Sequence, residues 1–246
     1  MSDPVVVLGM HRSGTSFLVR TLNLAGLWLG GDDQLHTTEG RAKIGNPKGN
    51  YENREGIDIN DTILTRSGGS WCNPPKQLIT NADDAARIVA LCKTLAHGQP
   101  DGYRRWGWKD PRMILTLDIW LEVLKSNIFI VGSYRHPSAV AKSLLARDGI
   151  PLEIGYALWA FYVQRLITHI KKYPSVLVRF DVEKEVLLGQ VVNICNRTGL
   201  HSDINTISSW YDSKLVRSAT ITNDSSAMFR RVASLWEELV SLHERH

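Results

Sequence analysis

The sequence has few cysteines and no cysteine pair of the kind that binds a metal. Only three of its 246 residues are cysteines, at positions 72, 92 and 195, and none forms a C-x-x-C motif. Secreted disulfide-rich domains use larger, even numbers of cysteines, and structural zinc sites use closely spaced pairs. The pattern argues against both, so we expect no metal site and a reducing compartment such as the cytoplasm.

Long basic runs and long apolar runs are also missing. The net charge is +4 and no block of five or more basic residues occurs, so nothing indicates a nucleic-acid partner. No apolar stretch approaches the roughly 20 residues of a membrane-spanning helix. The first residues, MSDPVVVLGM, lack the features of a signal peptide. We therefore expect a cytoplasmic protein without membrane insertion, whose small basic excess suits an anionic ligand.

Short β-rich runs alternate with helical patterns along the chain. The predicted strands lie at 5–8, 103–108, 128–134 and 176–180. The predicted helices lie at 15–25, 109–124, 135–149, 152–172, 182–199 (with Asp181 as its N-cap) and 227–243. This alternation predicts an α/β fold, a single P-loop-like domain over 1–246 with a central parallel sheet flanked by helices on both faces. Such sheets bind ligands at the carboxyl ends of their strands.

The stretch at 30–56 interrupts this alternation. It is long, polar and rich in glycine: GGDDQLHTTEGRAKIGNPKGNYENREG. Loops of this length inside compact domains are commonly functional. We interpret it as an active-site loop, with a surface insertion as the alternative.

The turn after the first predicted strand has the composition of an anion-binding loop. In GMHRSGTS, Gly9 and Gly14 allow a tight turn whose N–H groups converge on one anion. The following helix adds its positive N-terminal end, with Ser13 or Thr15 as its predicted cap and Gly26 at its end. Because a strand precedes the loop and a helix follows it, the loop predicts a phosphate or sulfate site.

The loop lacks the lysine of ATP- and GTP-binding loops. Thr15 stands where G-x-x-x-x-G-K-[ST] requires lysine, and the nearest cation is Arg12. That lysine neutralises charge on the β- and γ-phosphates of a magnesium-bound nucleotide. The loop therefore suits an anion other than a metal-bound triphosphate.

A second anion site is indicated at the third predicted strand. In RHPSAVAKS, Arg135 ends the strand, and Ser143 lies on the helical face that points back to it. The alternative is an arginine paired with an acid and an incidental serine.

Together these motifs resemble those of sulfotransferases that use 3′-phosphoadenosine 5′-phosphosulfate (PAPS), and in particular bacterial members of that family. The segments NPKGNYENREGIDINDTIL, WKDPRM and RDGIPLEIGYALWAFYV are similar to segments of such members, so the resemblance covers most of residues 1–180. It implies a glycine-rich loop that binds the 5′-phosphosulfate, and an arginine and a serine spaced R-x7-S that bind the 3′-phosphate. PAPS would be the cosubstrate, and no metal is needed.

The resemblance assigns roles to individual residues. The residues implied at the 5′-phosphosulfate are Arg12, Ser13, Gly14, Thr15 and Ser16, and those at the 3′-phosphate are Arg135 and Ser143. Lys109 matches a lysine near the sulfuryl group, with a salt bridge to Asp110 as the alternative. We expect Arg112 to be structural.

The sequence departs from the family in two places. Pro111 occupies the position of the catalytic histidine of the cytosolic enzymes. Carbohydrate- and tyrosine-modifying members use a glutamate after the first helix instead. This resemblance implies Glu52 as the general base, with Glu39 and Asp33 as the next candidates. Each could equally be an exposed loop acid. The C-terminal nucleotide-binding segment is also missing, and Lys214 or Arg217 in WYDSKLVRS is its expected replacement.

The predicted activity is transfer of a sulfuryl group from PAPS to a hydroxyl or amine of a small acceptor, a carbohydrate being favoured. Tryptophans such as Trp71, Trp106 and Trp108 would either stack on that acceptor or belong to the core. The alternatives are a P-loop kinase that acts on a small molecule, and a non-catalytic nucleotide-binding protein on the same fold.

Overall fold

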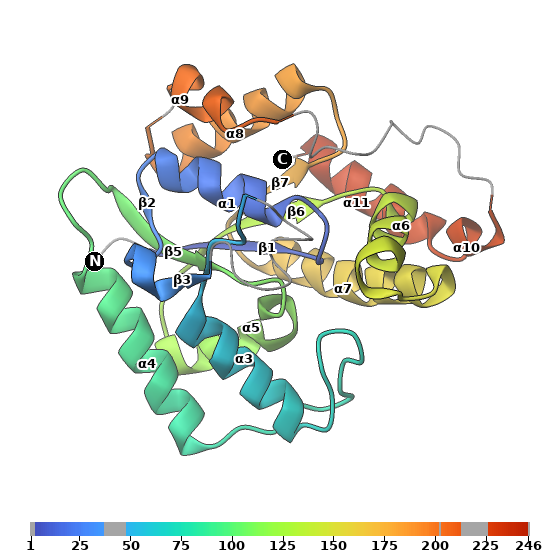
Figure 1. Ribbon diagram of the computed structural model, residues 1–246, viewed down its shortest axis with the longest axis horizontal. Coiled ribbons are helices and arrows are strands. Elements are labelled where there is room, and N and C mark those ends of the chain that lie inside the picture. The colour runs from blue at the N-terminus through green and yellow to red at the C-terminus, as the bar shows by residue number, and fades with distance from the viewer. Residues whose placement is uncertain (1–2, 37–47, 202, 213–225, 246) are drawn as a thin grey trace.

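The computed structural model describes residues 3–36, 48–201, 203–212 and 226–245, and a five-stranded sheet lies at its centre (Figure 1). The strand order is β2-β5-β1-β6-β7, and every pairing in the sheet is parallel. The strands are β1 (Val5–Gly9), β2 (Leu27–Trp28), β5 (Arg105–Lys109), β6 (Phe129–Tyr134) and β7 (Ser175–Arg179). The predicted α/β fold with a parallel sheet is therefore confirmed.

Both faces of the sheet are buried, which explains why its central strand reads as an unbroken apolar run. Val5 and Val7 of β1 belong to one core, and Val6 and Leu8 to the other. The first core is covered by α1 (Thr15–Leu24), α8 (Lys184–Thr198) and α9 (Ile204–Ser209). The helices that contribute to the second core are α3 (Arg54–Arg66), α4 (Ala82–His97), α5 (Met113–Leu124), α6 (Pro137–Asp148), α7 (Leu152–Lys172) and α11 (Ala233–Arg245).

The predicted cap of α8 and the predicted extent of the last helix are wrong. Asp181 does not cap α8, because its carboxylate accepts the His136 N–H at 3.0 Å and pairs with Arg179 at 3.1 Å, which ties β7 to the end of β6. The single helix predicted over 227–243 is instead α10 (Ala227–Arg230) followed by α11. Near the break between α10 and α11, Phe229 stacks on His136, and Val232 is buried in the core. The chain therefore packs both side chains where a single straight helix was predicted.

The polar stretch at 30–56 contains short regular elements in its described part. They are η1 (Asp32–Gln34), β3 (Leu35–His36) and β4 (Glu52–Asn53), and β3 pairs antiparallel with β4. The Asn53 side chain accepts the N–H groups of Glu55 and Gly56 and so starts α3. The paired strands fix the position of Glu52. Within the described ranges, the helices include none that is long and apolar enough to cross a membrane.

The turn between β1 and α1 is shaped by Gly14. The N-cap of α1 is Gly14 in a left-handed conformation (φ 84°), and no described side chain caps the helix. The prediction of Ser13 or Thr15 as cap is therefore wrong. The Gly14 Cα faces the ring of Phe180 directly after β7, so a Cβ at this position would overlap the ring. The turn thus needs glycine for its backbone conformation and for its close approach to Phe180.

We expect Gly14→Ala to destabilise the fold through both effects. The left-handed conformation costs about 1 kcal/mol for alanine, and overpacking against Phe180 adds about 1–3 kcal/mol. Gly68→Ala is the matched control, since Gly68 also has a positive φ (75°) but open space around its Cα. Urea unfolding should show a clearly larger loss for Gly14→Ala, and equal losses would contradict the role of Phe180.

Candidate active site

Three neighbouring strands bring the predicted residues together at one edge of the sheet. β1 lies between β5 and β6, with Val7 paired to Lys109 and Gly9 paired to Ser133. The anion loop therefore leaves β1 between Lys109, the last residue of β5, and Arg135, the first residue after β6. This is the edge where parallel sheets bind ligands.

The anion loop presents donors that have no acceptor of their own. The first amides of a helix have no partner within it, and among the residues that the structure describes, the N–H groups of Gly14, Thr15 and Ser16 donate to nothing. The Ser13 hydroxyl is buried and lacks a hydrogen-bond partner in the described chain. Buried polar groups are normally paired. The loop therefore has several open donors close together, the kind of groups to which an anion binds at a helix N-terminus.

A buried ion pair stands beside this loop. Lys109 Nζ lies 2.5 Å from Glu52 Oε1, and their side chains are 1% and 9% exposed. Lys109 also donates to Ser16 Oγ at 3.0 Å and to the Asn50 carbonyl at 3.2 Å. The pair thus joins β5, β4 and the first turn of α1.

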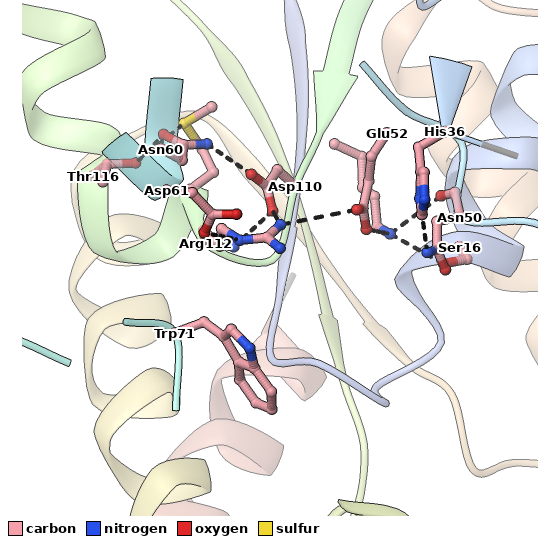
Figure 2. A network of polar contacts seen from close by, with 12 residues as sticks. Ser16, His36, Asn50, Glu52, Asn60, Asp61, Trp71, Asp110, Arg112 and Thr116 are labelled. Atoms are coloured by element: carbon pink, nitrogen blue, oxygen red, sulfur yellow. Dashed lines mark hydrogen bonds and ion pairs between the residues drawn. The ribbon is translucent and has the colours of Figure 1, made fainter. Parts of the chain in front are cut away.

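A second set of charges surrounds Arg112, as Figure 2 shows. Its guanidinium lies 2.6 Å from Asp61 and 2.9 Å from Asp110, with Glu52 Oε2 at 4.0 Å. Asn60 donates to Asp110 at 2.8 Å and accepts hydrogen bonds from Thr116 and Trp120. Asp110 is therefore bound by Arg112 and Asn60, and Lys109 pairs with Glu52 instead. Arg112 has the structural position that we expected.

Arg12 connects the two predicted anion sites. Its Nε donates to Ser143 Oγ at 2.8 Å, and its carbonyl accepts a hydrogen bond from Arg135 at 3.1 Å. The Arg12 backbone is left-handed (φ 70°), which is uncommon for a residue other than glycine. Burial lowers the pKa of Arg135 from its ordinary value, so a bound anion would offset a real desolvation cost. Arg12, Arg135 and Ser143 form one cluster.

The remaining predicted residues do not join this cluster. Asp33 is exposed on η1. Glu39, Lys214 and Arg217 lie outside the described residues. Trp106 and Trp108 are buried in the core, whereas Trp71 is only partly buried and contacts His11.

Two residues of the site were missed by sequence reasoning. Asn50 contributes its backbone carbonyl to Lys109, and a backbone contact leaves no signal in a sequence. His11 lies inside the anion-loop motif next to Arg12, and its place between β1 and the loop could have marked it.

Comparison with known proteins identifies the fold. No family model matches the chain, and no curated protein matches it either. A structural match covers 100% of this chain and 95% of the sulfotransferase domain of the olefin synthase from Synechococcus PCC 7002, with a TM-score of 0.50 and 18% identity. The chain has a sulfotransferase fold. The sulfotransferase STF1 of Mycobacterium tuberculosis H37Rv is 14% identical to this chain, with 99% of this chain and 76% of that one covered and a TM-score of 0.44.

We expect the Lys109–Glu52 pair to be strongly coupled. Lys109→Met leaves Glu52 buried without its nearest cation and should cost about 3–5 kcal/mol of unfolding free energy. Adding Glu52→Gln removes the orphaned charge, so the double variant should be more stable than Lys109→Met alone.

Urea unfolding of the two single variants and the double variant measures this coupling. The exposed pair Lys171–Glu238, with a similarly short contact of 2.6 Å, is the control and should couple by only about 0–1 kcal/mol. Similar coupling for the two pairs would contradict the structural importance of the buried pair.

Proposed function

We propose that the protein transfers a sulfuryl group from PAPS to a hydroxyl or amine of a small acceptor. The observation that carries this proposal is the junction of two anion sites through Arg12. One is the loop with its open amides and the unpartnered Ser13 hydroxyl, and the other comprises Arg135 and Ser143, each of which is hydrogen-bonded to Arg12. A nucleotide with anionic groups at both its 5′ and 3′ positions would engage the two sites together.

In this proposal each site takes one end of the donor. Ser13, Gly14, Thr15 and Ser16 hold the 5′-phosphosulfate through amides and hydroxyls, at the positive end of α1. Arg135 and Ser143 hold the 3′-phosphate, and Arg12 lies between the two ends. The remaining nucleotide contact that we propose, Arg217, lies outside the described residues.

Metal-free chemistry suits these residues. A sulfuryl group carries less charge than a terminal phosphoryl group. In this proposal, the cations Lys109 and Arg12 take the place of a metal beside the leaving 5′-phosphate, where negative charge develops. Lys109 reaches Ser16 Oγ in the first turn of α1 and would stabilise negative charge on the leaving 5′-phosphate. Arg12 would do the same from the loop. We therefore propose a direct in-line transfer with no metal and no covalent enzyme intermediate.

Glu52 is the acid that we propose as general base. Its buried carboxylate lies against Lys109, directly beside the anion loop. When Lys109 turns to the anionic donor, the carboxylate becomes free to take the acceptor proton. The ion pair between Lys109 and Glu52 therefore keeps the carboxylate occupied until the donor is bound.

The acceptor is proposed to be a carbohydrate or another small polar molecule, on the grounds of the charged loop at 30–56. The cytoplasm is the proposed compartment, as the cysteine pattern indicates.

Binding of the donor product tests the function without knowledge of the acceptor. Adenosine 3′,5′-bisphosphate should bind in a calorimetric titration with chelator present and no added metal. Arg135→Ala should weaken this binding about 10- to 100-fold, the loss of a charge-assisted hydrogen bond to phosphate. The same variant should change the weaker affinity for 5′-AMP far less, because 5′-AMP has no 3′-phosphate.

Arg231→Ala is the matched control for this titration, since Arg231 is exposed and pairs with Glu153. Binding of ATP that requires magnesium, with no binding of the bisphosphate, would overturn the proposal in favour of a kinase. Bisphosphate binding without any turnover of PAPS would favour a non-catalytic nucleotide-binding protein.

Glu52→Gln should lower sulfuryl transfer about 10- to 100-fold, since a general base contributes on this order or more. The affinity for adenosine 3′,5′-bisphosphate should stay nearly unchanged. Glu55→Gln, on the adjacent helix α3 where Glu55 pairs with Arg87, is the control. Wild-type turnover in Glu52→Gln would contradict the role of Glu52 and return Glu39 and Asp33 to consideration.

A further inference from the structure

His11 occupies the anion loop between β1 and Arg12, and aromatic rings hold its side chain in place. Its ring centroid lies 4.3 Å from that of Trp71 and 6.2 Å from that of Tyr162. The Tyr162 hydroxyl donates to the Trp71 carbonyl at 2.8 Å, which fixes the segment that carries Trp71. The imidazole is thus oriented by packing.

The nitrogens of this ring are not used by the protein. Neither forms a hydrogen bond with any residue in the described ranges, and Nε2 is shielded from solvent. A neutral imidazole has one donor and one acceptor nitrogen, and buried polar atoms without partners are rare. An oriented, unpartnered histidine one residue from a proposed catalytic arginine is therefore suited to contact a ligand.

The surroundings keep His11 neutral. Burial lowers the pKa of His11 well below 6.5, and nearby positive charges lower it further. These cations are Arg112, Arg147, Lys109 and Arg12. The acids paired with three of them are Asp61, Asp110, Glu52 and Asp148, and Tyr162 is the titratable group that faces His11 from α7. At neutral pH the ring therefore has a free lone pair.

Donor binding would change this balance. PAPS brings several negative charges to Arg12 and Lys109, two of the cations that oppose protonation of His11. A nearby opposite charge favours the protonated form of a base, so the pKa of His11 should rise toward the pH at which the enzyme works. A general base is most effective in that range.

We propose that His11 is a further catalytic residue, a second proton acceptor beside Glu52 that contacts the acceptor hydroxyl once the donor is bound. This inference rests on the proposed function. Glu52 is already engaged by Lys109 before the donor arrives, whereas the imidazole has no partner to give up.

As the acceptor oxygen forms its bond to sulfur, its proton passes to the free ring nitrogen of His11. The bond between sulfur and the bridging oxygen breaks, and its electron pair leaves with the 5′-phosphate of adenosine 3′,5′-bisphosphate. The imidazolium then releases the proton to water, and no other reactant is required.

The first experiment follows the protonation of His11 itself and needs no acceptor. The ring signals of the eight histidines are titrated by NMR in the free protein and in the complex with adenosine 3′,5′-bisphosphate. The His11 signal is assigned by its loss in His11→Asn. Its titration midpoint should rise by about 1–3 pH units in the complex.

The second experiment measures turnover with water as the acceptor, as release of sulfate from labelled PAPS. His11→Asn and His11→Gln should each lower the rate about 10-fold or more, with bisphosphate affinity changed little. The low-pH limb of the rate profile should also shift. His97→Asn is the matched control, because His97 is exposed at the end of α4, where its ring forms a hydrogen bond with the Lys93 carbonyl. His11→Asn combined with Glu52→Gln should be slower than either single variant.

The outcomes separate this inference from the function on which it rests. If the wild-type protein does not bind the bisphosphate, the proposed function fails. If it binds but the His11 midpoint stays in place, or if both His11 variants keep the wild-type rate and profile, the role of His11 is overturned and the sulfuryl transfer stands. The titration midpoint itself is measured in the wild-type chain, and His11→Gln gives a second means of assigning the His11 signal if His11→Asn misfolds.

Discussion

Lys109 carries a buried positive charge at the end of a central strand, and much of the surrounding structure compensates for that charge. Moving an ammonium group out of water is costly unless an acid and further acceptors surround it. Glu52, Ser16 and the Asn50 carbonyl fill these roles, and they come from three separate parts of the chain. The position of β4, the start of α3 and the orientation of α1 are all linked to this one side chain.

Acidic side chains compensate the positive charge at Lys109 and Arg112, but several donors of the neighbouring anion loop have no acceptor in the described chain. Arg112 is surrounded by carboxylates, whereas the anion loop keeps open amides and a buried hydroxyl without a partner. Positive potential is therefore concentrated where a ligand would lie. Natural proteins tolerate such unsatisfied groups at functional sites because the ligand completes them. Burial is the first cause of the lowered pKa of His11, and the nearby cations lower it further.

The sequence was most informative where one local segment determines the structure. The run VVVLG, the glycine turn and α1 follow each other directly, and the distance from Arg135 to Ser143 is fixed by one helix. It was least informative where the partner is remote. Asp181 binds His136 instead of capping α8, and Glu52 meets Lys109 across 57 positions. The helices α3 and α4 were not predicted, although Asn53 and the capping box of Asn81 and Asp84 marked their starts.

The backbone at Arg12 also bears on how other chains of this fold can be read. A left-handed arginine costs roughly 1–2 kcal/mol relative to a right-handed one, and glycine or asparagine would fit this turn more easily. Random drift at such a position runs toward the cheaper residues. An arginine found there, directly before S-G-T, is therefore held in place by what its side chain binds, and a glycine in its place would keep the architecture but lose the link to Ser143.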